Sequence, residues 1–359
     1  MARIDSFLRL VAEQGASDLH FHAGNPPIIR FNGDLVPLPY RRLSSEEARR
    51  FIYEILTVEQ RQEFEKNSEL DLVYIIEKVG RFRTNVMIQG HGLGAVFRII
   101  PQKLPTIDEL MLPRAIRKLT QLQNGMVLVC GPTGSGKTTT LAAMLHEINH
   151  TSQRHIITIE DPIEFIHQPL NSTVTQRQVG KHTETFAGAL RSALRESPDV
   201  LVVGEMRDLE TIQLAMQATE TGVLVMGTLH TNSAAKAIDR IIDVVDEETR
   251  EQVRGVLSVL LRGIVSQQLC KKIGGDGRVA ALEILLQNYA VSHMIRENKL
   301  HQLDGYLETA SSDGSGAQSL DHAIFQYVKE GMVDVEEACR MATYPEHIRH
   351  LQQQLPKEL

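Results

Sequence analysis

Two patterns of apolar and polar residues follow one another along the chain. Over about the first hundred residues, short alternating runs are mixed with short amphipathic segments, whereas from about Gly125 apolar runs of strand length alternate with helical segments. Strands that alternate with helices are typical of a mostly parallel sheet covered by helices. The sequence therefore predicts an α+β N-terminal domain followed by an α/β domain.

The first pattern predicts a small mixed domain. Leu19 and Phe21 alternate with polar residues and are expected to point inward from a strand. The dipeptide Asn32-Gly33 favours a type I′ hairpin turn, and Ser44 begins a capping box that opens a helix. The predicted elements are helices over residues 4–14, 44–56 and 57–64, a hairpin over 28–36, and strands over 16–22, 70–76, 81–88 and 95–100.

A stretch with three prolines separates the two patterns. Pro101, Pro105 and Pro113 make residues 101–113 a predicted linker, which divides a domain at residues 1–100 from a domain at 114–359. The last 70 residues or so are expected to be helical, with an interruption at 311–316. The other elements predicted in the second domain are strands over 126–130, 155–159, 200–203 and 223–229, and helices over 138–150, 185–196, a segment ending near 219, and 246–269. A tight turn is predicted over 274–277, between the segments 271–273 and 279–285.

Composition and charge are those of an ordinary globular protein. Hydrophobic residues make up 42% and charged residues 23%, and the formal net charge of -7 argues against an overall nucleic-acid binder. Cys130, Cys270 and Cys339 are far apart and form no Cys-x-x-Cys, so neither a structural zinc site nor a disulfide framework is expected. Isolated thiols suit a reducing cytoplasm. Neither a signal peptide nor a membrane span is expected, because the apolar runs are far shorter than the ~20 residues of a span.

One stretch carries a specific chemical signal. Residues 131–138 fit the phosphate-loop pattern, in which glycines let backbone N–H groups converge on phosphate oxygens at a helix N-terminus. An apolar strand precedes this stretch and a helix follows it, as the pattern requires. Lys137 is expected to reach the β- and γ-phosphates of ATP, and the Thr138 hydroxyl to bind Mg²⁺. The expected nucleotide-binding residues are Gly131, Pro132, Thr133, Gly134, Ser135, Gly136, Lys137, Thr138 and Thr139.

Two carboxylates and a histidine follow other predicted strands of the same sheet. Glu160 directly ends its strand and is assigned the role of activating water; Glu205 follows the next strand and is expected to hold Mg²⁺ through water. The alternative is that either glutamate merely pairs with a nearby arginine. His230 ends a third strand, from which it could sense the γ-phosphate by hydrogen bonding.

Two arginines of the N-terminal domain are candidates for the positive charge that phosphoryl transfer needs. If residues 89–92 form the loop of a hairpin, Ile88 pairs with Leu93 and Arg83 faces Arg98. Like charges directly opposite one another are destabilising, so this register suggests an anion near the pair. Two alternatives stay open: the arginines pair with separate carboxylates, or a five-residue loop abolishes the pairing.

The ordered motifs resemble those of type IV pilus twitching-motility ATPases of the PilT type, within the secretion ATPase superfamily. Nearly the whole chain is covered: residues 16–20 resemble the N-terminal signature, 160–164 the Asp box, 198–208 the Walker B region with glycine before the glutamate, and 221–232 the His box. The resemblance implies a RecA-like P-loop ATPase domain preceded by an α+β PAS-like domain. It also matches the family's N-domain arginines to Arg83 and Arg98, with Arg81 nearby.

The sequence departs from the family pattern in two places. The His box normally begins Thr-Gly-His, but position 223 is Val, which leaves His230 as the one histidine of the box. In the C-terminal retraction motif, Ser292 replaces the first arginine, although Arg296 and Glu297 are kept.

The resemblance implies a motor that hydrolyses ATP with Mg²⁺ to power pilus retraction and twitching motility. Its expected partners are five further copies in a homohexamer, an inner-membrane pilus platform protein and other pilus motor ATPases, at the inner face of the cytoplasmic membrane; no nucleic acid is expected. One alternative is a pilus-extension or type II secretion ATPase, although these usually carry a four-cysteine metal site that this chain lacks. Another is a nucleic-acid translocase, which the net charge and the absence of an evident aromatic, basic platform disfavour. A regulatory module without turnover is disfavoured by the two strand-end carboxylates.

Overall fold

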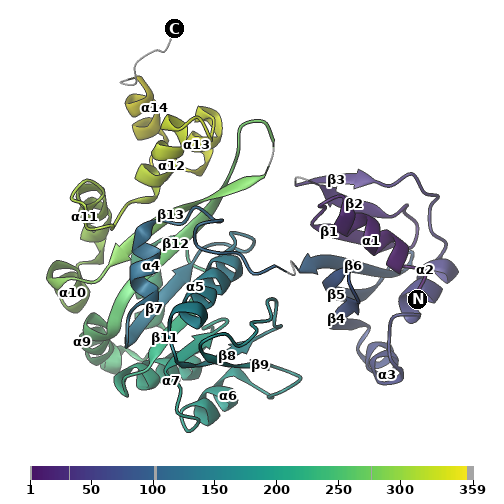
Figure 1. Ribbon diagram of the computed structural model, residues 1–359, viewed down its shortest axis with the longest axis horizontal. Coiled ribbons are helices and arrows are strands. Elements are labelled where there is room, and N and C mark those ends of the chain that lie inside the picture. The colour runs from purple at the N-terminus through teal and green to yellow at the C-terminus, as the bar shows by residue number, and fades with distance from the viewer. Residues whose placement is uncertain (1, 32, 101–102, 276, 354–359) are drawn as a thin grey trace. The chain divides into compact units, whose positions relative to one another are not determined.

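The computed structural model describes residues 2–31, 33–100, 103–275 and 277–353. Backbone contacts divide the chain into two compact units, Met1–Lys103 and Leu104–Leu359. Each unit has its own sheet (Figure 1) and buries its own apolar side chains. Within the part of the chain described, no helix combines the length and apolar character needed to cross a bilayer.

The N-terminal unit is a six-stranded antiparallel sheet in the order β3-β2-β1-β6-β5-β4. Leu19 and Phe21 are fully buried, as predicted, and the Phe21 ring stacks on that of Phe51 with 5.5 Å between centroids. The capping box at Ser44 is present, because its side chain accepts a hydrogen bond from the N–H of Glu47 and its own N–H donates to the Glu47 carboxylate. The elements are α1 Asp5–Glu13, β1 Asp18–His22, β2 Ile28–Phe31, β3 Asp34–Pro37, α2 Ser45–Tyr53, α3 Val58–Asn67, β4 Glu69–Ile76, β5 Gly80–Gln89 and β6 Gly92–Ile100.

The predicted hairpins of this unit form. Strands β2 and β3 pair with Phe31 opposite Asp34, around a turn whose Gly33 has a φ of 97°; Asn32, the other predicted turn residue, lies outside the described residues. Strands β5 and β6 pair with Ile88 opposite Leu93 and Arg83 opposite Arg98, the predicted register.

The second unit is a seven-stranded sheet in the order β13-β12-β7-β11-β10-β8-β9. Alternate residues of β7 enter different cores: Leu128 packs on the face covered by α6 to α9, and Val129 on the face covered by α4 and α5. The sheet is parallel except where β12 meets β13. Its elements up to the last crossover are α4 Arg114–Thr120, β7 Gly125–Cys130, α5 Lys137–Thr151, β8 His155–Glu160, β9 Thr173–Gln178, α6 Phe186–Ala193, β10 Val200–Val203, α7 Leu209–Glu220, β11 Leu224–Leu229 and α8 Ala234–Asp243.

The long helix predicted over 246–269 is wrong beyond residue 260. After the short turn η1 Glu247–Thr249 and helix α9 Arg250–Leu260, the chain becomes strand β12 Leu261–Lys271, which lies between β7 and β13 Arg278–Leu286. Pairing on both edges satisfies the backbone of this segment and buries most of its residues, including the continuous run 263–267, which outweighs its local helical pattern. Strand β9 was not predicted, because this edge strand is polar and only partly buried.

The chain ends in a group of helices. Residues from β12, β13 and the helices α12 to α14 form a separate small core around Cys270, Val279 and Leu320. Figure 1 shows these helices in yellow at one end of the β12–β13 hairpin. The elements are α10 Tyr289–Arg296, η2 Leu300–Gln302, α11 Leu303–Ala310, α12 Leu320–Lys329, α13 Val335–Met341 and α14 Pro345–Gln353.

Candidate nucleotide site

Four neighbouring parallel strands of the second unit end in the predicted polar groups. In the spatial order β7-β11-β10-β8, the phosphate loop follows β7, His230 follows β11, Glu205 lies just beyond β10, and Glu160 ends β8. Parallel strands have their carboxyl ends at one edge of a sheet, which is where open α/β sheets bind ligands. The topology therefore brings groups that are up to a hundred residues apart in sequence to one edge.

The phosphate loop has the backbone that its glycines permit. Gly131, Gly134 and Gly136 have φ values of 145°, 81° and 86°, and a Cβ at Gly131 would lie 2.4 Å from the carbonyl oxygen of Gln267. The Lys137 side chain is 8% exposed, and its Nζ donates hydrogen bonds to the carbonyl oxygens of Gly131 (2.8 Å) and Pro132 (3.1 Å). Burial lowers the pKa of Lys137. The lysine thus folds back over its own loop.

Glu160 occupies a largely buried position at the end of β8. Its Oε1 accepts hydrogen bonds from the Thr158 hydroxyl (2.6 Å) and from Nε2 of Gln176 (3.0 Å). Burial raises the pKa of Glu160 above its usual range, and the hydrogen bonds offset only part of that rise. Such a carboxyl group accepts a proton more readily than an exposed one, as a general base must.

The close packing around position 204 explains why a glycine precedes Glu205. A Cβ at this position would lie 3.0 Å from the carbonyl oxygen of Ile159 and 3.2 Å from the Cα of Glu160. The backbone N–H of Gly204 also donates to that Ile159 oxygen at 2.8 Å. A larger residue would force β10 away from the end of β8, so the glycine keeps the two glutamates on adjacent strands.

Glu205 belongs to a chain of polar contacts that reaches the phosphate loop. Arg207 donates to its Oε2 at 2.6 Å, His230 Nε2 lies 3.1 Å from its Oε1, and the other ring nitrogen of His230 is 3.5 Å from the Thr133 hydroxyl. Partial burial alone would raise the pKa of Glu205, but the contacts with Arg207 and His230 outweigh it, and the pKa lies below its usual value. Glu205 is therefore ionised and can interact with a cation.

Both glutamates fit the role of site residues, but only one of them pairs with an arginine. Glu160 takes neutral partners, whereas Glu205 is bound by Arg207, as the alternative interpretation allowed. Position 223 lies at the other end of β11 from His230, and Val223 is 7% exposed in the apolar core. The family histidine that Val223 replaces would thus stand at the opposite edge of the sheet.

The two arginines lie in the N-terminal unit, where Arg98 has an internal counter-ion. Arg98 Nε donates to Asp18 Oδ1 at 2.8 Å, and Arg30 lies 3.7 Å from the other oxygen of this buried carboxylate. The pairing register places Asp18 of β1 opposite Arg30 of β2 on one side and opposite Arg98 of β6 on the other. The Arg83–Arg98 register therefore does not by itself require an external anion, because Asp18 already compensates Arg98.

Sequence reasoning missed three residues that these contacts involve. Asp18 stands within the N-terminal signature, Arg207 lies two residues after Glu205 in the Walker B region, and both could have been considered as ion-pair partners. Gln267 was hidden by the incorrect helix prediction, because only the strand assignment turns it toward the phosphate loop.

Mg²⁺ fits the residues at this edge without a closed protein cage. Among the described residues, no group of three or more His, Cys, Asp or Glu side chains is arranged to hold a metal ion. Mg²⁺ in nucleotide sites commonly takes only one or two protein oxygens and completes its shell with water and phosphate. Thr138 and Glu205 offer such oxygens, and because both Glu205 oxygens already contact Arg207, this residue suits an ion held through water.

The fold and the loop define a P-loop nucleotide-binding protein of the α/β class. Comparison with known proteins narrows this class. Residues 1–340 match the family described as Type II/IV secretion system protein, and the chain belongs to that family.

Relatives and solved structures agree with this assignment. The chain is 48% identical over 344 residues to the type IV pilus retraction ATPase PilT of Pseudomonas aeruginosa, covering 96% of this chain and 99% of the relative. It is 47% identical to a twitching motility protein of Neisseria gonorrhoeae, covering 88% of this chain and 84% of that protein. A crystal structure of the pilus retraction motor PilT with bound ADP superposes with a TM-score of 0.87 at 42% identity, covering 98% of this chain and all (100%) of that one. The ATPase DotB of Legionella pneumophila has a TM-score of 0.82 at 27% identity, covering 93% of this chain and 94% of that chain.

These structural matches confirm the predicted fold class, a RecA-like ATPase domain preceded by a PAS-like α+β domain.

Proposed function

We propose that this protein is a motor that hydrolyses ATP to power type IV pilus retraction and twitching motility. The observation that carries the proposal is the phosphate loop at a sheet edge shared with Glu160, Glu205 and His230. It occurs in a chain that is 48% identical, over 96% of its length, to a pilus retraction ATPase.

The carboxylates divide the work according to their surroundings. Glu160, whose pKa burial raises, accepts a proton from the attacking water. Glu205, whose pKa is lowered, stays ionised; it would hold Mg²⁺ through water, and the Thr138 hydroxyl would supply a second protein oxygen for the ion. When bound, Mg²⁺ neutralises charge on the β- and γ-phosphates.

Four cationic or polar side chains act on the phosphates. Lys137 leaves its loop carbonyl partners to contact the β- and γ-phosphates, a move that exchanges neutral acceptors for anionic ones. His230 lies between Glu205 and the loop hydroxyl of Thr133. It can therefore sense the γ-phosphate by hydrogen bonding while it contacts the Glu205 carboxylate. Arg83 and Arg98 supply positive charge from the N-terminal domain; for Arg98 this requires sharing or releasing Asp18.

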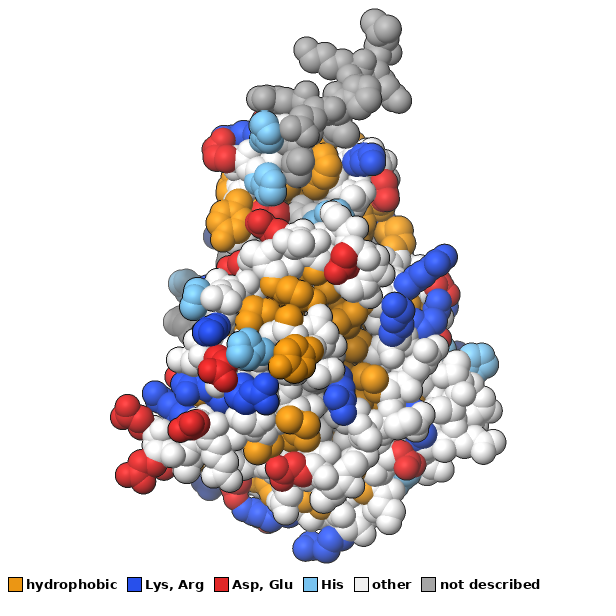
Figure 2. All heavy atoms as spheres, turned by 90° about the vertical axis from the view of Figure 1, so that its left-hand side faces the viewer, with side chains coloured by type: hydrophobic (Ala, Val, Ile, Leu, Met, Phe, Trp, Pro, Cys, Tyr) orange, Lys and Arg blue, Asp and Glu red, His pale blue; other side chains and the backbone are white. Residues whose placement is uncertain are grey.

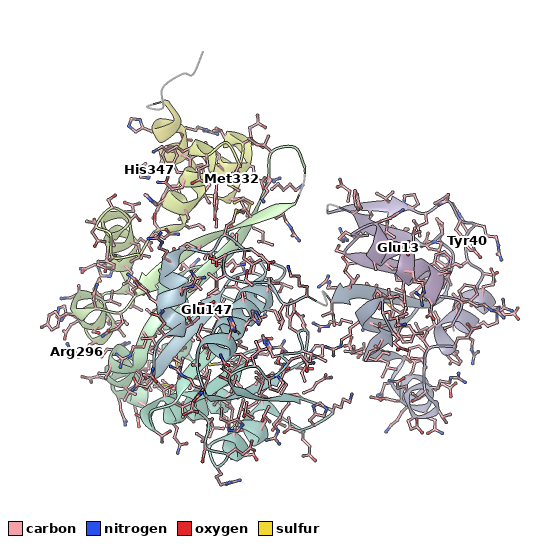
Figure 3. All side chains as sticks on the ribbon, in the orientation of Figure 1. Glu13, Tyr40, Glu147, Arg296, Met332 and His347 are labelled. Atoms are coloured by element: carbon pink, nitrogen blue, oxygen red, sulfur yellow. The ribbon has the colours of Figure 1, made fainter. Side chains whose placement is uncertain are left out.

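Assembly and location rest on the family. The proposed unit is a homohexamer at the inner face of the cytoplasmic membrane, acting on a pilus platform protein and beside other pilus motor ATPases. The face of the molecule in Figure 2 supports docking of a protein partner, since it exposes hydrophobic side chains among charged ones of both signs. Figure 3 places Arg296 of the family's retraction motif at the end of α10, where it is exposed.

The first test removes the lysine charge. Lys137→Ala should abolish ATP hydrolysis and weaken nucleotide binding, because the loop then lacks its point charge on the phosphates. Lys181→Ala, which removes an exposed lysine of the same domain, is the matched control. Hydrolysis near the wild-type rate in the Lys137 variant would overturn the whole assignment.

Two further measurements separate the alternatives. A nucleic-acid translocase should be stimulated by DNA in the ATPase assay, whereas the proposed motor should not. Deleting the gene should leave cells with abundant but immobile pili if the motor retracts them. Loss of surface pili would instead identify an extension motor.

A further inference from the structure

Gln267 is a buried polar residue on β12, outside every nucleotide-binding motif. It is 2% exposed, and both ends of its amide are hydrogen-bonded. Nε2 donates to the carbonyl oxygen of Ser135 at 2.6 Å, and Oε1 accepts from the Thr140 hydroxyl at 2.6 Å. Because a carbonyl oxygen can only accept, the amide nitrogen must face Ser135. One side chain thus joins the phosphate loop to the helix that follows it.

The bond to Ser135 determines how the next peptide unit is oriented. In a trans peptide, the C=O of one residue and the N–H of the next point in opposite directions across one plane. Holding the Ser135 carbonyl toward β12 therefore turns the N–H of Gly136 away from β12. In a phosphate loop, N–H groups turned outward in this way are the ones that meet phosphate oxygens.

The loop also lies directly against the backbone and side chain of Gln267. A Cβ at Gly136 would lie 2.9 Å from Gln267 Nε2, and a Cβ at Gly131 would lie 2.4 Å from the Gln267 carbonyl oxygen. Parallel pairing of Ser266 with Cys130 at the end of β7 places Gln267 beside the first loop residue. Gln267 therefore lies so close to Gly131 and Gly136 that neither position has room for a side chain.

We propose that Gln267 is a positioning residue of the nucleotide site, which holds the Ser135–Gly136 peptide in the orientation that binds phosphate. This inference rests on the proposed ATPase function and adds a residue that no sequence motif contains. The competing interpretation is a satisfied core glutamine, whose loss would lower stability without a specific effect on nucleotide affinity.

The test compares Gln267 with its neighbour. Gln267→Met keeps the volume but removes both hydrogen bonds, and Gln267→Glu keeps an acceptor for Thr140 but offers no N–H to the Ser135 carbonyl. Gln268→Met and Gln268→Glu are matched controls, because Gln268 is the adjacent strand residue, on the other side of the pleat and only partly buried. Affinities for ADP and a non-hydrolysable ATP analogue are measured together with the thermal midpoint of the nucleotide-free proteins.

Both Gln267 variants should bind ADP and the ATP analogue about ten-fold more weakly than wild type, the effect of losing roughly 1.4 kcal/mol of loop-ordering contacts. The loss should be equal for the two nucleotides, since Gly136 belongs to the loop that both occupy. The Gln268 controls should keep wild-type affinity. Unchanged affinity in a Gln267 variant, or a loss that the corresponding Gln268 control shares, overturns the inference. Failure of the wild-type protein itself to bind ADP would instead overturn the proposed function.

Discussion

The pH dependence of stability should reveal one buried carboxyl group, Glu283 on β13. It is 8% exposed, and its Oε1 accepts a hydrogen bond from the backbone N–H of Ala234, the first residue of α8, at 2.6 Å. Burial raises the pKa of Glu283 to about 7, the nearby carboxylates Asp304 and Asp321 add to the rise, and the Ala234 hydrogen bond opposes it.

The size and sign of the effect follow from proton linkage. Raising the pKa from 4.5 to about 7 corresponds to ~3 kcal/mol, since a tenfold change in proton affinity is worth about 1.4 kcal/mol. Between these values the folded protein keeps a proton that the unfolded chain has released. The free energy of unfolding therefore falls as the pH rises through this range, and the loss is complete above about pH 7.

Glu283→Gln removes the titration while its amide oxygen can still accept from Ala234. The variant should be more stable than wild type by up to ~3 kcal/mol near pH 8, and should differ little from it near pH 5. Because the chain contains no tryptophan, urea unfolding is followed by far-UV circular dichroism. Glu220→Gln, an exposed substitution of the same kind, should show no such pH-dependent difference.

Two results would refute this reasoning. A stability difference that is the same near pH 5 and pH 8 would mean that Glu283 does not titrate between them. A variant less stable than wild type near pH 8 would mean that the ionised carboxylate is stabilising, through a stronger bond to Ala234 or through a compensating charge.

The remaining predictions concern the carboxylates and the arginines. Glu160→Gln should still bind ATP and Mg²⁺ but lose hydrolysis, whereas Glu205→Gln should raise the Mg²⁺ concentration needed for turnover; the reverse pair of phenotypes in a magnesium titration would show that the roles are exchanged. Arg83→Ala and Arg98→Ala should each reduce ATP affinity about ten- to a hundred-fold with a smaller effect on ADP, and equal weakening for both nucleotides would place the arginines away from the γ-phosphate. Arg98→Ala should in addition lower the thermal midpoint, because it leaves the buried Asp18 with a weaker counter-ion; a midpoint unchanged from Arg83→Ala would argue against that role.

Local patterns in the sequence were sufficient for the elements that carry the phosphate loop. The glycine spacing of residues 131–138 and the flanking strand and helix are short-range features, so they predicted β7 and α5 closely. The positions of Glu160, Glu205 and His230 at strand ends also followed, because a parallel sheet aligns its carboxyl ends. The register of β5 and β6 was predicted separately, from the length of the single turn that joins them.

Contacts between distant segments decided the rest. Residues 261–269 have a helical pattern of apolar side chains, yet β7 and β13 offer edges on both sides, and pairing with both makes this segment a strand. Only that strand brings Gln267 to the phosphate loop. Likewise, the facing of Arg83 and Arg98 was predictable, but the Asp18 partner of Arg98 lies 80 residues away in sequence, across a strand pair that no local pattern encodes. Hydrophobic periodicity and turn chemistry act over a few residues, whereas a buried charge or amide is satisfied by whatever group the completed fold places beside it.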